Sequence, residues 1–122
     1  MNAFDKEIYE MIENVFEYCG SSLLSLSDFD LEGVIYEDFM FQYTDLNEEN
    51  LKILHKNKII SKDAIKKGLR IRKLSDIAFS PEVEFSAKFV RTSPIWKEIF
   101  QLADEVKAEL AKFHDKSKDD EI

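Results

Sequence analysis

Apolar side chains recur every three or four residues along the first part of the chain. The stripe lies between Ala3 and Cys19 and consists of Phe4, Ile8, Met11, Ile12, Val15, Phe16 and Cys19. Glutamates fill the positions between them, so one face of a helix would be apolar and the other charged. Gly20 follows directly, and glycine is the residue that most readily ends a helix. We therefore predict an amphipathic helix over Ala3–Cys19.

A second stripe marks a long helix near the C-terminus. Ser93 is a good capping residue, and Pro94 suits the first helical position because its missing N–H would have no partner there. The stripe then continues through Trp96, Ile99, Phe100, Ala103, Val106, Leu110 and Phe113. We predict a closing helix over Pro94–Phe113 with Trp96 in the core. Residues 114–122 have almost nothing to bury, so a charged, disordered tail is expected.

Two capped helices are predicted in the middle of the chain. Asn47 caps the first, over Glu48–Lys56, and Ser61 caps the second, over Lys62–Ala78. Gly68 weakens the second helix by about 1 kcal/mol relative to alanine, so the helix bends there or a neighbour approaches closely. A short apolar connector or helix follows the break at Ser80-Pro81.

Residues 21–45 have two possible interpretations. Asp28 or Asp30 would cap a helix over Leu31–Tyr43, but Phe39, Phe41 and Tyr43 alternate as in a strand. Hairpin turn signals that would pair a strand are few, so a helix is preferred. Of the aromatic residues here, three are expected in the core and two, with polar tips, at the surface. The core residues are Phe29, Phe39 and Phe41, and the surface residues are Tyr36 and Tyr43.

Composition limits the fold to one domain. The 122 residues are 44% hydrophobic and 34% charged, with three glycines and two prolines. So few turn residues disfavour a sandwich or barrel of short strands. We predict an all-α, single-domain bundle of four to five helices over residues 1–113, closed by the long C-terminal helix. The single cysteine, the charged N-terminus and the lack of an apolar run long enough for a membrane span lead us to expect a cytoplasmic protein.

Charge is distributed unevenly along the sequence. Residues 1–50 contain thirteen acids and one base, a net charge of −12, whereas residues 51–80 contain nine bases and two acids, a net charge of +7. The remaining residues carry −3, which gives −8 for the chain. The basic segment cannot neutralise the acidic half. Such asymmetry favours a charged face that attracts a partner of opposite sign.

Catalytic and metal-binding motifs are not found. The sequence has no glycine-rich phosphate loop, nucleophile elbow, zinc-binding HExxH or CxxC pair. A calcium loop beginning at Asp28 would have its glycine at Gly33, but Phe39 stands where a glutamate is required. Cys19 and His55 have no local feature that would make them a nucleophile and base. We expect a binding protein without a cofactor or metal, not an enzyme.

The basic segment suggests an alternative. Nine lysines and arginines fall within residues 52–73, which would suit phosphate contacts in a helix-turn-helix over residues 48–78. The negative charge of the whole chain opposes a polyanion, however. Nucleic acid is therefore the less favoured partner, and pairing of this segment with the acidic half is preferred.

The region from Asp28 to Glu49 interleaves carboxylates with aromatic side chains. In protein interfaces, charge accelerates encounter and a few aromatic side chains supply much of the affinity. We predict a partner-binding surface formed by Asp28, Asp30, Glu32, Tyr36, Glu37, Asp38, Tyr43, Asp45, Glu48 and Glu49. Its expected partner is a basic protein such as a nuclease, in which these carboxylates would take the place of substrate phosphates. No membrane partner is expected.

The runs IISKDAIKKGLRIRKLSDIAF and FVRTSPIWKEIFQLADEV give a family resemblance. Residues 47–113 resemble the closing half of small immunity proteins encoded beside bacterial contact-dependent growth-inhibition toxins and related bacteriocins. The resemblance implies an acidic, cytoplasmic, non-catalytic protein that neutralises one cognate toxin domain by direct binding. Because immunity interfaces vary with the toxin, it assigns no binding residues. An acidic nucleic-acid mimic or adaptor is the alternative.

Overall fold

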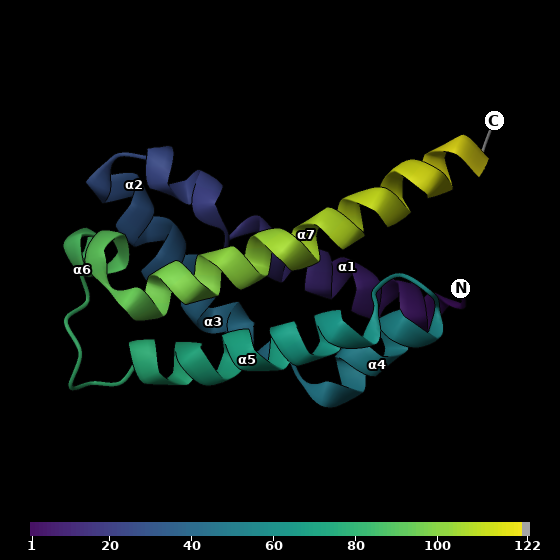
Figure 1. Cartoon of the computed structure of the whole chain (residues 1–122), viewed down its shortest axis with the longest axis horizontal. Helices are drawn as coiled ribbons and strands as arrows, with labels where there is room; N and C mark the ends of the chain where they lie inside the picture. The colour runs from purple at the N-terminus through teal and green to yellow at the C-terminus, as the bar shows by residue number, and fades with distance from the viewer. Residues whose placement is uncertain (121–122) are drawn as a thin grey trace.

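The computed structural model describes residues 1–120, with side chains as far as Lys116, and this part of the chain is helical without strands (Figure 1). The α-helices are α1 (Ala3–Glu17), α2 (Asp28–Gly33), α3 (Met40–Gln42), α4 (Glu48–Lys56), α5 (Lys62–Ala78), α6 (Ala87–Thr92) and α7 (Pro94–Asp120). Short 3-10 turns occupy Ser21–Ser25 and Tyr43–Asp45, and a π-helix occupies Val34–Phe39. The prediction of an all-α bundle closed by a long C-terminal helix is confirmed.

Helix α7 runs the length of the bundle and organises its packing (Figure 1). Helix α5 packs along α7, and α4 contacts both α1 and α5. Helices α2 and α6 lie together at one end, beside the loop that follows α5. None of the helices in residues 1–120 combines the length and the apolar character that crossing a bilayer requires.

Local capping explains most helix starts. Asn47 and Ser61 cap α4 and α5 as predicted, accepting hydrogen bonds from the amides of Asn50 (2.8 Å) and Ala64 (3.1 Å). The cap of α2 was predicted wrongly. Ser27 accepts from the Asp30 amide, so that Asp28 and Asp30 lie in the first turn, where carboxylates favour the positive helix end.

The core is aromatic around Trp96, which is fully buried as predicted. Its ring lies 5.5 Å from the rings of Phe79 and Phe100 and 6.0 Å from that of Phe39. Gly68 permits the predicted close approach, because a Cβ there would lie 2.8 Å from Leu51 Cδ1 on α4.

The predicted end of the last helix was too early. Helix α7 continues from Phe113 to Asp120, so the expected disordered tail at 114–122 is helical as far as the structure describes it. His114, Asp115 and Lys116 are exposed, consistent with a segment that buries little. Glu121 and Ile122 lie outside the described residues.

The ambiguous stretch at 31–43 is helical, as preferred, but two of its aromatic assignments were wrong. Phe29 and Phe41 were expected in the core, yet their side chains are 83% and 74% exposed. Each lies two residues from a buried residue, Leu31 or Phe39. Two residues correspond to about 200° around a helix axis, so each phenylalanine faces away from the side that is covered.

Candidate partner-binding site

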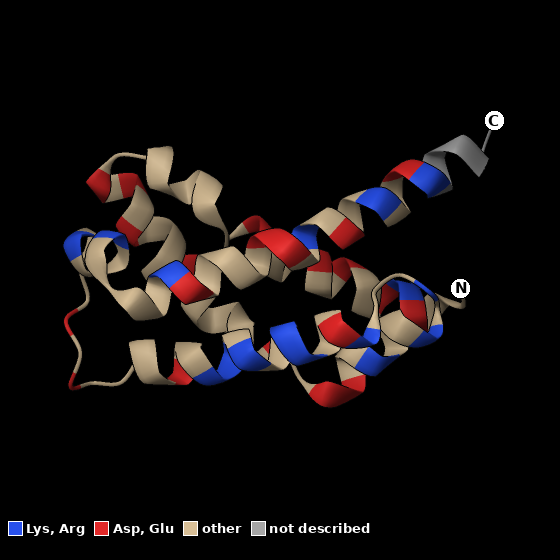
Figure 2. Ribbon diagram, in the orientation of Figure 1, with Lys and Arg blue, Asp and Glu red and all other residues tan. Residues whose placement is uncertain are grey.

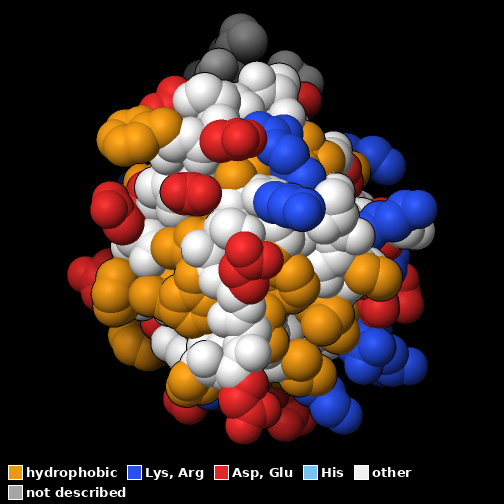
Figure 3. All heavy atoms as spheres, turned by 90° about the vertical axis from the view of Figure 1, so that its left-hand side faces the viewer, with side chains coloured by type: hydrophobic (Ala, Val, Ile, Leu, Met, Phe, Trp, Pro, Cys, Tyr) orange, Lys and Arg blue, Asp and Glu red, His pale blue; other side chains and the backbone are white. Residues whose placement is uncertain are grey.

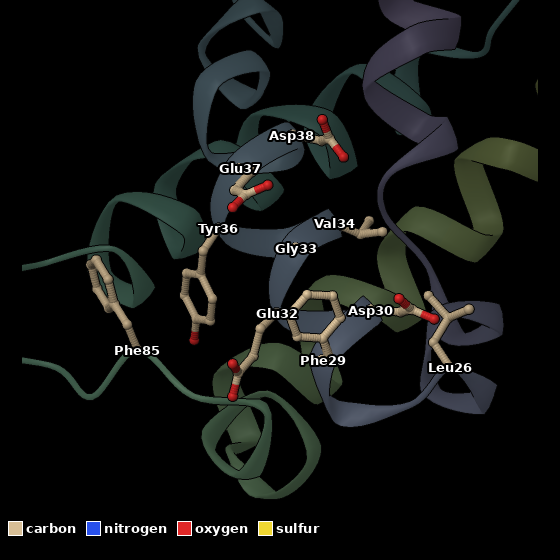
Figure 4. Close-up of a pocket in the computed structure, with 10 residues that line it drawn as sticks. All are labelled: Leu26, Phe29, Asp30, Glu32, Gly33, Val34, Tyr36, Glu37, Asp38 and Phe85. Carbon is tan, nitrogen blue, oxygen red and sulfur yellow. The ribbon is translucent and has the colours of Figure 1, made fainter.

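The outer side of α2 and the π-helix carries a shallow hollow of about 660 Å³, which we call the α2 hollow (Figure 4). Five of the predicted binding residues line it: Asp30, Glu32, Tyr36, Glu37 and Asp38. The other lining residues are Leu26, Phe29, Gly33, Val34 and Phe85. Among the described residues, the lining therefore contains four carboxylates and three aromatic rings, and no lysine or arginine.

The aromatic wall of the hollow is formed by Tyr36 and Phe85, whose rings stack 5.0 Å apart at an interplanar angle of 14°. The Tyr36 hydroxyl accepts a hydrogen bond from the Ser86 amide (3.1 Å) and donates one to the Ser86 carbonyl (3.3 Å). Burial raises the pKa of this hydroxyl above its ordinary value. Tyr36 thus holds the loop after α5 in place. Its hydroxyl was predicted to be exposed at the surface, but it is hydrogen-bonded to the backbone of Ser86.

Two of the exposed apolar side chains at this end are phenylalanines that the sequence did not single out as surface residues. Phe29 is the most exposed, and Phe85 is 47% exposed. Figure 3 shows apolar side chains gathered on this end of the molecule, with carboxylates among and around them. A signal for Phe85 was available, since it follows Glu82 and Glu84 after the break at Pro81. A phenylalanine in so acidic a loop is a poor core candidate.

The carboxylates of the hollow differ in their bonding. Glu32 accepts a hydrogen bond from the Ala87 amide at the start of α6 (3.0 Å). Asp30 and Glu37 are exposed and Asp38 is half-buried, and none of the three forms an ion pair with a side chain in residues 1–116. Their charge is therefore uncompensated locally.

Asp28 has a structural partner. Arg91 Nε lies 3.0 Å from Asp28 Oδ1, and the same guanidinium donates to the carbonyls of Leu24 (2.7 Å) and Leu26 (2.6 Å). Arg91 thereby fixes the chain that leads into α2. Asp28 contributes less net charge to the surface than the sequence suggested.

The remaining predicted residues do not line the hollow. Figure 2 shows acidic residues at α2 and, apart from them, at the start of α4. Tyr43 donates to Asp76 Oδ1 (2.6 Å), and burial together with this carboxylate raises the pKa of Tyr43 to about 12. Burial also raises the pKa of Asp45. Glu48 pairs with Lys52 (2.7 Å), and Glu49 is exposed at the start of α4. The ten predicted residues therefore form two separate groups, of which only the α2 group surrounds a hollow.

The basic segment is paired mostly with its own helix and with α7. Lys67 lies 2.9 Å from Asp63 and 3.8 Å from Glu105, and Arg70 lies 3.0 Å from Glu98. Pairing with the acidic half is limited, among the ion pairs of residues 1–116, to Lys52–Glu48 and Lys56–Asp5. The cations of α5 thus do not neutralise the α2 hollow.

Other candidate chemistry gains no support from the geometry. Cys19 is fully buried, and burial raises the pKa of its thiol, which is the opposite of what a reactive thiolate needs. His55 lies in the last turn of α4, and its Nδ1 is 2.9 Å from the carbonyl oxygen of Ile60. Within the described residues, no three His, Cys, Asp or Glu side chains are grouped so that they could hold a metal ion.

Comparisons of the chain with protein-family models, with curated proteins and with solved structures give no match. The fold and the site define a helical bundle with an acidic, aromatic hollow at one end.

Proposed function

We propose that this chain is an immunity protein that neutralises a cognate bacterial toxin, a basic nuclease-type domain, by binding it through the α2 hollow and the acidic surface around it. The observation that carries the proposal is the combination of uncompensated charge at Asp30, Glu37 and Asp38 with the exposed ring of Phe29. Clustered exposed apolar side chains with a polar rim are typical of protein interaction sites. The family resemblance of residues 47–113 supplies the functional class.

The surface suits inhibition by occlusion. The carboxylates attract a basic partner over a distance and raise the association rate, and the aromatic rings lose contact with water in the complex. A nuclease binds phosphates with cationic side chains, and carboxylates of this chain would pair with those side chains instead. Substrate would then be excluded without any chemical step by this chain.

The geometry favours this partner over nucleic acid. Lys67 and Arg70, which would contact phosphates in a helix-turn-helix, already have carboxylate partners on α5 and α7. The α2 hollow would repel a polyanion. The alternative function, an acidic inhibitor or adaptor that mimics nucleic acid, would use the same surface. It would differ from an immunity protein only in the identity of the basic partner.

The decisive experiment is a matched pair of charge reversals. One variant changes Asp30, Glu37 and Asp38 to lysine, and the control changes the exposed α1 residues Glu7, Glu10 and Glu17 to lysine. Both variants undergo the same change in net charge. We expect the α2 variant to lose protection against the toxin encoded beside the gene, with an association rate lower by about 10- to 100-fold at low salt. The α1 variant should protect cells.

Two results would contradict the proposal at different levels. Loss of protection in the α1 variant with retention in the α2 variant would place the binding surface elsewhere. A wild-type chain that protects against no toxin encoded beside its own gene would refute the immunity function itself.

A further inference from the structure

Gly33 lacks a structural reason to be glycine. It lies in the floor of the α2 hollow with an ordinary helical φ of −59°. Apart from its chain neighbours and its own helix backbone, a Cβ added there would meet no atom of the described residues within 4 Å. The other two glycines are explained by the fold, since Gly20 has a φ of +136° and Gly68 lies against Leu51. Glycine weakens a helix relative to alanine. Because position 33 has no side chain, the floor of the hollow is open.

The walls around this floor have the character of a site for a planar cation. In Figure 4 the ring of Phe29 stands on one side of Glu32, and the stacked rings of Tyr36 and Phe85 stand on the other. Glu32 uses one carboxylate oxygen, Oε1, for the Ala87 amide, and its second oxygen accepts no hydrogen bond within the described residues. The exposed carboxylate of Glu37 lies at the opposite end of Tyr36 in the same view.

We propose that the α2 hollow receives an arginine side chain of the basic partner, with its guanidinium against the aromatic rings and its N–H groups donating to Glu32 and Glu37. This inference rests on the proposed function, in which the partner is a basic protein. Arginine fits better than lysine because its flat, weakly hydrated head stacks on rings and its five donors reach separate carboxylates. The volume of about 660 Å³ lies within the range of roughly 300–1,000 Å³ that is usual for ligand sites.

The direct test is a nuclear magnetic resonance titration of the full chain with three blocked pentapeptides that differ only in the central residue. The central residues are arginine, lysine and citrulline, which has the shape of arginine without its charge. We expect the arginine peptide to bind with a dissociation constant on the order of 1 mM, as suits one side chain. Amide shifts should centre on Gly33, Glu37 and Phe85. The lysine peptide should bind at least about 3-fold more weakly, and the citrulline peptide should cause no such shifts.

Filling the floor should abolish this binding. Gly33→Leu places a good helix former in open space, so the fold should persist while the arginine peptide binds at least about 10-fold more weakly. The control is Glu10→Gln, which removes an exposed carboxylate of α1 outside the hollow and should leave binding unchanged. If Gly33→Leu disturbs the helical spectrum, Phe29→Ala removes an exposed ring of the same hollow and should give the same loss.

The outcomes separate this inference from the proposed function. Equal binding of the arginine peptide by wild type and Gly33→Leu, or shifts centred on the start of α4, would overturn the arginine site. Equal binding of the citrulline peptide would do the same. If the arginine peptide does not bind but the triple reversal at the hollow still abolishes protection, the immunity function stands and the arginine site fails. If the peptide binds and Gly33→Leu loses it yet protects fully, the hollow binds arginine but not the partner's arginine, so this inference fails while the immunity function stands.

Discussion

The same substitution, glycine to alanine, should change stability in opposite directions at positions 33 and 68. In both helices alanine gains about 0.5–1 kcal/mol from helix propensity. At Gly33 the new methyl group meets nothing within 4 Å, so the whole gain should appear in the free energy of unfolding. At Gly68 the methyl group would lie 2.8 Å from Leu51 Cδ1 and 3.3 Å from Leu51 Cδ2.

Leu51 is fully buried, so its side chain cannot turn away without disturbing its neighbours. Overpacking of this kind destabilises by about 1–3 kcal/mol. After the propensity gain is subtracted, Gly68→Ala should therefore lower the free energy of unfolding by up to about 2 kcal/mol. The two variants should differ by roughly 1–3 kcal/mol, although both add one methyl group to a helix.

Urea unfolding followed by circular dichroism measures this difference directly, as a shift in midpoint at constant slope. A third variant combines Gly68→Ala with Leu51→Ala, which removes the atoms that clash. The double variant should then be destabilised by less than the sum of the two single variants. If Gly68→Ala proves as stabilising as Gly33→Ala, the tight contact between α4 and α5 is refuted. If Gly33→Ala destabilises, the open floor of the hollow is refuted.

Two further predictions concern the core and the pH dependence of stability. Trp96→Ala should lower the free energy of unfolding by about 3–5 kcal/mol because the indole is fully buried among three aromatic rings, and Trp fluorescence typical of water in the folded wild type would contradict this. Burial raises the pKa of Asp45 in the folded chain above its ordinary 3.8, so ionisation of this carboxyl disfavours the fold and stability decreases as pH rises through that window. Asp45→Asn should accordingly raise the melting temperature at pH 7 and leave it unchanged at a pH below the folded and unfolded pKa of Asp45. An equal increase at pH 7 and at the low pH would exclude ionisation of Asp45 as the cause.

The helix starts could be predicted from the sequence because they depend on neighbouring residues. Asn47 and Ser61 accept hydrogen bonds from amides only three residues ahead, and both helices have the predicted bounds. The stripe that contains Trp96 is equally local. The end of α7 was missed because a helix without apolar positions, such as the part after Phe113, has no periodic signal.

The site could be predicted only in part, because its geometry depends on contacts between distant segments. Tyr36 bonds to Ser86, 50 residues away, and Tyr43 bonds to Asp76, 33 residues away. Neither partner can be identified from spacing, so both tyrosines were assigned to the surface by their polar tips alone. Phe29 and Phe41 were wrongly assigned to the core because of their apolar character alone. That character does not show which side of a helix packs against the rest of the bundle.

The acidic half remains largely unneutralised because of the way the helices pack, and not only because of the numbers of charges. From the sequence, the basic segment was too small to neutralise the acidic half. In the fold, α5 lies along α7, so Lys67 and Arg70 face Glu105 and Glu98 and are largely unavailable to the acidic half. The uncompensated negative charge consequently includes the three carboxylates of the α2 hollow. Attraction between exposed charges is screened over about 10 Å at 0.1 M salt, so association with a basic partner should slow as salt increases. The stacking contacts to the phenylalanines should be much less affected, and the dissociation rate should therefore depend on salt less than the association rate does.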